Sequence, residues 1–159
     1  MPGQGHKGRP YGFRQKGFIA MAQQVREIMT SAPVTVAPDT SVVDVARRMR
    51  EENIGAVLVV EGDRLKGLVT DRDLVVRVLA EGAEAATRTV EQACSADLVA
   101  VGPDDEVDRA VELMREHAVR RLPVVEDGRA VGIIALADLA MERDPGSALG
   151  DISVAEPND

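Results

Sequence analysis

The sequence predicts an α+β fold, a sandwich-like module in which two copies of one unit pack together. Three observations predict it: the chain repeats itself at a constant offset, each copy has an amphipathic helix pattern, and two short β-rich runs follow each helix. A unit of roughly 50 residues has little interior of its own. The two copies are therefore expected to pack sheet against sheet.

The repeat extends over the whole unit, and its identical pairs are spread along both copies. They include Pro38 and Pro103, Val42 and Val107, Met49 and Met114, Val59 and Val124, Gly67 and Gly132, and Asp73 and Asp138. We expect a pseudo-two-fold axis that brings equivalent positions together. The predicted boundaries are 22–82 and 83–143 for the two repeats, with a flexible basic leader at 1–21 and an acidic tail without a sustained apolar face at 144–159.

A short extended segment, 34–36 or 99–101, opens each copy, and an amphipathic helix follows it. In the first copy, residues 39–41 supply N-cap side chains, and apolar residues at 42, 45, 46 and 49 follow at helical spacing. In the second copy the same spacing recurs at 107, 110, 111 and 114, after Pro103-Asp104. This stripe of valine, alanine and methionine is interpreted as core.

Two β-rich runs joined by a turn come next and predict a hairpin. The runs are 56–60 and 65–70 in the first copy, and 121–125 and 130–135 in the second. A final helix is expected from Asp71 to about Ala80 in the first copy, and from Ala137 to about Met141 in the second.

Composition excludes several classes of function. The formal net charge is −8, and the acid-free residues 1–21 leave the rest of the chain more acidic still, which argues against duplex nucleic acid or an anionic membrane as partner. All aromatic residues precede Met21, which excludes single-strand readers built on stacking. No apolar run approaches the ~18 residues of a membrane span, Cys94 is the single cysteine, and His6 and His117 suggest no metal site. A cytoplasmic location is expected.

The segment from Gly67 to Asp73 carries the clearest chemical signal, because a predicted strand runs there into a helix start. Helix-terminal amides suit anions, and a carboxylate such as Asp73 can accept two hydrogen bonds from a ribose diol. Thr70 adds a hydroxyl, and Gly67 leaves room for close approach. Thr70 and Asp73 equally fit a capping box, worth about 0.5–2 kcal/mol as pure structure. The spacing leaves both interpretations open.

Taken together, the repeated helix-strand-strand-helix unit, residues 39–41, the Leu122-Pro123-Val124-Val125 strand and the 67–73 segment resemble a tandem pair of cystathionine β-synthase (CBS) domains over about residues 22–142. The resemblance implies a module that binds adenosine-containing ligands in clefts between the sheets. It also implies a homodimer, often disc-shaped. On the same basis Asp73 would hold a ribose, with Thr70 beside it.

The second copy departs from this pattern. Ala135 stands where the hydroxyl belongs, so the second pocket is expected to be weaker, different in ligand, or empty. Asp138 fits a helix-dipole residue as well as a ribose contact. Arg120 and Arg121, where the first copy has Gly55 and Ala56, suit phosphate oxygens, and they fit a solvated pair at a strand edge equally well.

Further contacts are assigned more loosely. Arg72 is a weaker candidate for the phosphates, and an aliphatic slot for adenine would come from Thr35, Ala56 and Val57, as the resemblance suggests. Val57 fits the core as well.

Two functions follow from these residues. The first is a regulatory module for energy or stress sensing that binds AMP, ADP or ATP, with S-adenosylmethionine or NAD as other candidates, and acts on a separate, unidentified target protein. The alternative is a ligand-independent interaction or scaffold protein with a degenerate pocket. The sequence offers no nucleophile with an adjacent base and no P-loop, so no enzyme is predicted. An apolar helix face at Leu74, Val75, Val78 and Leu79 predicts the homodimer, unless the chain buries that face itself.

Overall fold

The computed structural model describes residues 23–82, 84–95, 98–143 and 146–155; the predicted leader lies outside them. The first repeat contains strand β2 (Thr35–Val36), helix α3 (Val42–Glu52), strands β3 (Ala56–Glu61) and β4 (Arg64–Thr70), helix α4 (Asp71–Leu74) and the π-helical turn η2 (Val75–Leu79). The second contains α6 (Val107–His117), β5 (Arg121–Glu126), β6 (Arg129–Ala135) and α7 (Leu136–Arg143). The predicted order of elements is thus present in both copies.

Shorter elements precede each repeat, and one follows the second. Helix α2 (Val25–Ile28) and strand β1 (Thr30–Ser31) precede the first repeat, and η3 (Ala85–Thr87) and α5 (Val90–Ala93) precede the second. Helix α8 (Ala148–Val154) follows α7. Helix α8 lies within the segment expected to be a tail, in which the sequence shows no sustained apolar face.

Both long helices end alike but begin differently. Helix α3 begins at Ser41, whose Oγ accepts a hydrogen bond from the Asp44 N–H at 3.1 Å, as the sequence predicts. Helix α6 begins after Glu106, which makes no side-chain cap hydrogen bond, so Pro103-Asp104 does not provide the matching cap. The helices end at Asn53 and Ala118, which both adopt a left-handed conformation with φ of 52°.

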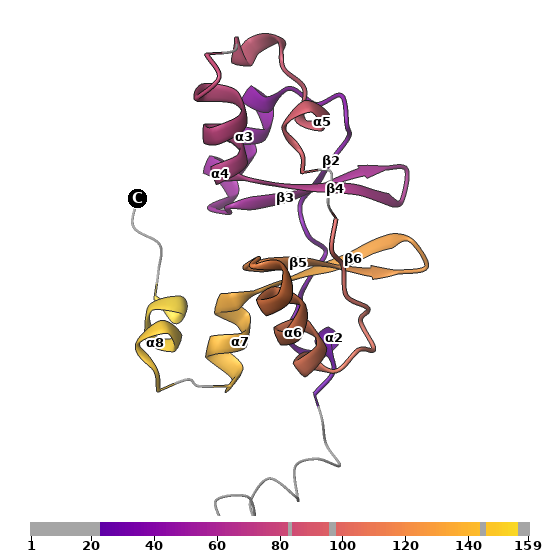
Figure 1. The fold of residues 1–159 in the computed structure, drawn as a ribbon, viewed down its shortest axis with the longest axis vertical. Helices are drawn as coiled ribbons and strands as arrows, with labels where there is room; N and C mark the ends of the chain where they lie inside the picture. Colours follow the sequence, from indigo (N-terminus) through magenta and orange to yellow (C-terminus); the bar gives the residue numbers. More distant parts are fainter. Residues whose placement is uncertain (1–22, 83, 96–97, 144–145, 156–159) are drawn as a thin grey trace, which may run out of the picture.

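The strands of the described chain form one six-stranded sheet built from two hairpins. Strands β3 and β4 pair antiparallel, as do β5 and β6, while β2 runs parallel to β3 and β1 pairs antiparallel with β6. The hairpins join through the pair Arg64 and Arg129 at their tips. Figure 1 shows the two hairpins one above the other, with α3 and α4 outside one and α6 and α7 outside the other.

Two hydrophobic cores, one for each repeat, each include a helix that precedes the other repeat. Val25 of α2 packs in the core of the second repeat, and Val90 and Ala93 of α5 pack in the core of the first. Matching backbone bonds hold them, since Val25 N–H donates to Asp105 O at 2.9 Å and Val90 N–H donates to Thr40 O at 2.7 Å. The pseudo-two-fold relation therefore includes the segments between the repeats.

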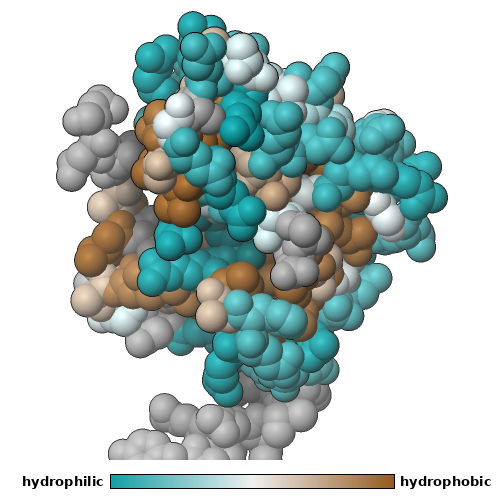
Figure 2. All heavy atoms as spheres, turned by 45° about the horizontal axis from the view of Figure 1, so that its top comes forward, coloured by the Kyte–Doolittle hydropathy of each residue, from teal (hydrophilic) through white to brown (hydrophobic). Residues whose placement is uncertain are grey.

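The end of the first repeat differs from the expected apolar face. Val78 is buried and Leu74 packs against the core, so the exposed residues are Val75, Val76 and Leu79. These exposed residues all lie in the π-helical turn η2, which follows Leu74. In Figure 2 apolar surface gathers on the left of the molecule, where α4, η2 and α8 lie in Figure 1. None of the helices among the described residues is long and apolar enough to cross a membrane.

Candidate functional site

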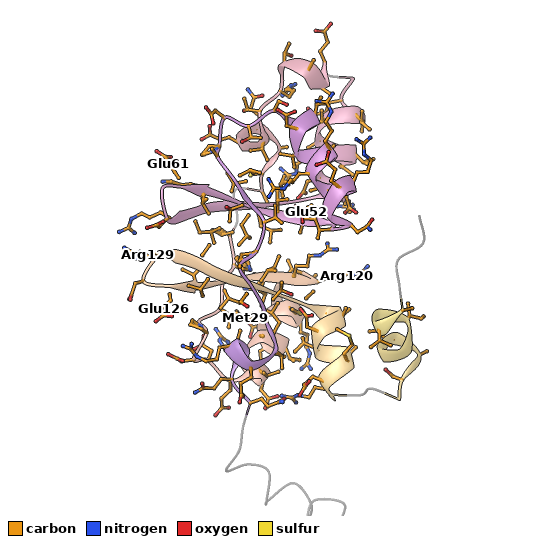
Figure 3. All side chains as sticks on the ribbon, turned by 180° about the vertical axis from the view of Figure 1, so that it is seen from behind. Met29, Glu52, Glu61, Arg120, Glu126 and Arg129 are labelled. Carbon is orange, nitrogen blue, oxygen red and sulfur yellow. The ribbon has the colours of Figure 1, made fainter. Side chains whose placement is uncertain are left out.

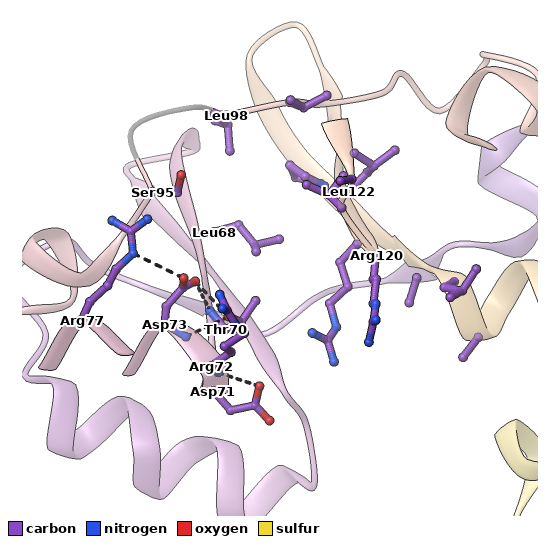
Figure 4. A pocket seen from close by; sticks show the side chains of 18 of the residues that line it. Leu68, Thr70, Asp71, Arg72, Asp73, Arg77, Ser95, Leu98, Arg120 and Leu122 are labelled. Carbon is purple, nitrogen blue, oxygen red and sulfur yellow. Dashed lines mark hydrogen bonds and ion pairs between the residues drawn. The ribbon is translucent and has the colours of Figure 1, made fainter. Parts of the chain in front are cut away.

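A cleft of about 910 Å³ lies between the two repeats (Figure 4). The first repeat contributes Leu68, residues 70–73 and Arg77 to its lining, and the second contributes residues 118–123 and 135–137. Ser95, Leu98 and Val99 complete the lining from the connecting segment, and Leu149 completes it from α8. The hairpin tips, marked by Glu61 and Arg129, lie on the opposite side of the molecule from Arg120 (Figure 3).

Asp73 is held at the start of α4 by the capping box that the sequence allows. Its Oδ2 accepts hydrogen bonds from the Thr70 N–H and the Thr70 hydroxyl, both at 2.9 Å. In return the Asp73 N–H donates to Thr70 Oγ1 at 3.1 Å. The other oxygen, Oδ1, lies 3.5 Å from Arg77 Nε. The capping interpretation is therefore correct, and it also fixes the orientation of a carboxylate that lines the cleft.

Cations outnumber carboxylates in the described lining. Four arginines line the cleft, namely Arg72, Arg77, Arg120 and Arg121, against the two carboxylates of Asp71 and Asp73. Figure 4 shows Arg72 and Arg77 on one side, with Arg120 opposite. The structure brings the basic pair of the second repeat, Arg120 and Arg121, into the same cleft as Asp73. In an acidic protein, this concentration of guanidinium groups makes the cleft a local site for anions.

Arg121 crosses from its own repeat to the other one. A Cβ placed on Gly55 would lie 2.8 Å from Arg121 Nη2 and 3.2 Å from Asp71 Oδ2. Gly55 is the counterpart of Arg120 in the repeat, so the first repeat has no side chain at the place where the second supplies cations. The absence of a Cβ at Gly55 is what admits the Arg121 guanidinium.

The residues expected to form an adenine slot lie elsewhere. Thr35 is exposed on β2, Ala56 pairs with Thr70 within the hairpin, and Val57 is 1% exposed in the core. Their counterparts explain the difference, because Arg121 and Leu122, which match Ala56 and Val57, line the cleft. The cleft thus combines the helix start of one repeat with the strand entrance of the other.

Gly67 also lies outside the described lining. It is buried in β4, and a Cβ at this position would lie 3.0 Å from Cys94 Sγ. Gly67 therefore makes room for Cys94, where the sequence suggested that it makes room for a ligand.

Asp138, the counterpart of Asp73, is not among the described lining residues either. Its Oδ2 accepts one hydrogen bond, from the Ala135 N–H at 2.8 Å. Ala135 has no hydroxyl to add a second. Burial raises the pKa of Asp138 above its ordinary value, and the bond from Ala135 offsets only part of this rise.

Some lining residues were missed from the sequence. Arg77 follows Asp73 by four residues, a spacing at which opposite charges meet on a helix, so that signal was available. Leu98 and Leu149 had no such signal, because the first lies in a connecting segment and the second in the expected tail.

Cys94, which packs beside Gly67, is poorly suited to act as a nucleophile. Burial raises the pKa of the Cys94 thiol to about 11, with a further contribution from the charge of Asp73. The reactive thiolate is therefore disfavoured at neutral pH. In the part of the chain that the structure describes, no group of three or more histidine, cysteine or acidic side chains could hold a metal ion.

Comparison with known proteins gives consistent matches. The family model described as CBS domain matches residues 25–80 and 90–144. The CBS domain-containing protein YhcV of Bacillus subtilis is 40% identical over 133 residues, which cover 81% of this chain and 94% of that protein. Hypoxic response protein 1 of Mycobacterium tuberculosis is 35% identical over 116 residues, covering 72% of this chain and 81% of that protein.

Solved structures agree with these matches. A signal-transduction protein with CBS domains from Burkholderia ambifaria superimposes with a TM-score of 0.72 at 31% identity, covering 79% of this chain and 96% of that one. The CBS domain pair of protein MJ0100, solved in complex with methylthioadenosine and S-adenosyl-L-methionine, superimposes with a TM-score of 0.68 at 25% identity. It covers 75% of this chain and 94% of that one.

Proposed function

The chain belongs to the CBS domain family, and from that premise we propose that it is a non-catalytic regulatory module that binds AMP, ADP or ATP between its repeats. One observation carries the proposal: the cleft combines a fixed carboxylate with four arginines. Its target is a separate protein whose identity the sequence does not give.

Each part of a nucleotide has a matching group in the cleft. Asp73 would accept the ribose hydroxyls, since a carboxylate has more acceptor positions than the cap and Arg77 occupy. Arg120 and Arg121 would bind the phosphates with paired N–H donors. The base would lie against aliphatic lining such as Leu98, Val99 and Leu122, because the described lining contains no aromatic ring.

The charge of the lining selects among adenosine compounds. Four guanidinium groups against two carboxylates favour a ligand with several negative charges. S-adenosylmethionine carries a positive sulfonium near the adenosine, so its affinity is expected to be lower than that of ATP. NAD, with a single diphosphate, is expected to lie between them.

Only one of the two pseudo-equivalent positions suits phosphate. The counterparts of the four arginines are Ala137 for Arg72, Glu142 for Arg77, Gly55 for Arg120 and Ala56 for Arg121. The counterparts of the four arginines therefore include no cation and one acid, Glu142. We expect one nucleotide per chain, and calorimetric titration with a stoichiometry of two would contradict this.

The test is thermal melting with AMP, ADP, ATP, S-adenosylmethionine or NAD, on the wild type, Asp73→Ala and Asp138→Ala. Both variants lose a helix-start hydrogen bond, but only Asp73 lines the cleft. A nucleotide at ~100 times its dissociation constant should stabilise the wild type and Asp138→Ala by about 2.7 kcal/mol, and Asp73→Ala far less. Equal shifts in both variants would mean that Asp73 acts only as a cap.

A scaffold protein without a ligand is the second candidate, and the capping box favours it. Thr70 and Asp73 already satisfy one another, so their presence is explained without a nucleotide. No melting shift with any compound of the panel would support this candidate.

We also propose that the chain forms a homodimer through the exposed face of η2. Val75, Val76 and Leu79 are 53%, 45% and 65% exposed, and they adjoin α4, which carries cleft residues. Leu79→Glu should then convert the dimer to a monomer in size-exclusion chromatography with light scattering. A wild-type species of 17.0 kDa would refute the dimer.

A further inference from the structure

Helix α8 lies beside the cleft and packs mainly on α7 (Figure 1). Ser147 caps it, since its Oγ accepts a hydrogen bond from the Gly150 N–H at 3.0 Å. Gly150 is buried, which places the backbone of α8 against the body of the protein. A helix of seven residues is not stable alone in water. Helix α8 is therefore expected to be helical only while it is docked.

Leu149 connects this helix to the cleft. It lines the cleft and also a second cavity, of about 690 Å³, between α6, α7 and α8. Val119 and Leu136 line both cavities as well, so these three side chains form the boundary between them. Leu149 is 44% exposed, whereas Ile152, further along α8, is 71% exposed and lines neither cavity.

We propose that α8 is a lid on the cleft, held by Leu149 against Val119 and Leu136, and that its docking and nucleotide binding strengthen one another. The inference rests on the proposed function, since the nucleotide is the occupant that meets the lid. An occupied cleft offers Leu149 contacts that exist only while α8 is docked. By linkage, the factor by which nucleotide favours the docked helix equals the factor by which docking tightens nucleotide binding.

The test compares Leu149→Asn with the matched control Ile152→Asn in the full chain. Both changes put the same neutral side chain on the same helix, so charge is balanced, and their helix propensities differ only as leucine differs from isoleucine. Hydrogen exchange without nucleotide should show α8 unprotected in Leu149→Asn, with faster exchange also at Leu136 and Ala137 in the first turn of α7. Ile152→Asn should match the wild type.

With ATP as the probe, Leu149→Asn should raise the dissociation constant at least about five-fold, and the control should leave it unchanged. Saturating ATP should slow exchange of the wild-type α8 amides by a similar factor. If α8 keeps its protection in Leu149→Asn, Leu149 does not hold the helix and the lid proposal is overturned. If protection is lost but ATP affinity is unchanged, the proposed coupling between the helix and the cleft is overturned.

If the wild type binds none of the nucleotides, the proposed function is refuted, and so is the coupling between α8 docking and nucleotide binding. The exchange measurement without nucleotide would still decide whether Leu149 holds α8 over the cleft, so the two failures remain distinguishable.

Discussion

Adding one methyl group at each of two equivalent glycines tests how tightly the surrounding atoms pack against each of them. Gly67 and Gly132 occupy matching positions in β4 and β6, opposite Val59 and Val124. A Cβ on Gly67 would lie 3.0 Å from Cys94 Sγ and 3.3 Å from Cys94 Cβ. A Cβ on Gly132 would lie 2.5 Å from Met29 Sδ and 2.9 Å from the Thr30 carbonyl oxygen.

The two costs should therefore differ. Overpacking a core costs typically 1–3 kcal/mol. The free-energy cost of Gly67→Ala should be about 1 kcal/mol, because the Cys94 side chain can move by a few tenths of an ångström. The free-energy cost of Gly132→Ala should be about 3 kcal/mol, because the Thr30 carbonyl belongs to the β1–β6 pair and cannot move without disturbing that pair.

Urea unfolding of both variants measures these free energies. Cys94→Ala removes the closer of the two atoms that oppose the new methyl group, so the double variant Gly67→Ala/Cys94→Ala should recover at least about 0.5 kcal/mol relative to additivity. Nucleotide affinity should stay unchanged in Gly67→Ala, because Gly67 lies outside the described lining. Equal costs at the two glycines, a reversed order, or strict additivity with Cys94→Ala would refute the reasoning.

Three further outcomes are expected. Ile134→Ala, at a fully buried position, should cost about 2–5 kcal/mol in urea unfolding with an unchanged m-value. Arg120→Ala should weaken ATP binding by about 1.5–3 kcal/mol, more at low salt than at high salt, whereas a salt-independent loss would argue against a phosphate contact. Asp138 has a folded-state pKa raised by burial, so the stability it contributes is full below its unfolded pKa and is lost as pH rises through the folded value. Asp138→Asn cannot ionise, so its stability relative to wild type should increase with pH over that window; a constant difference would contradict the assignment.

The repeated elements were predictable because local signals and the repeat agree. The hairpin around Glu61 and the helix ending at Glu52 follow from turn residues, β-rich runs and helical spacing, all of which act within a few residues. The capping box of Thr70 and Asp73 was visible for the same reason.

What the sequence did not predict depends on contacts between the repeats. The sequence has valine at the equivalent positions 25 and 90, but local pattern does not show that Val25 joins the second core and Val90 the first. This exchange, and the meeting of Asp73 with Arg120 and Arg121 in one cleft, depend on how the two repeats pack together. The adenine slot was expected at Val57, which the structure buries in the core, whereas its counterpart Leu122 lines the cleft. Local pattern gives both positions the same strand and does not show which of them faces the cleft.

Symmetry in the core and asymmetry in the cleft have a common physical origin. Core positions must bury the same apolar faces in both repeats, so pairs such as Val42 and Val107 keep their character. Side chains that line the cleft do not have to fill a core, and at these positions the two copies differ in charge. A nucleotide bound to Asp73 of one repeat and Arg120 of the other would contact both repeats at once. Because the described hairpins pair at their tips, at Arg64 and Arg129 on the far side of the molecule from Arg120, its affinity would depend on how the two repeats sit together.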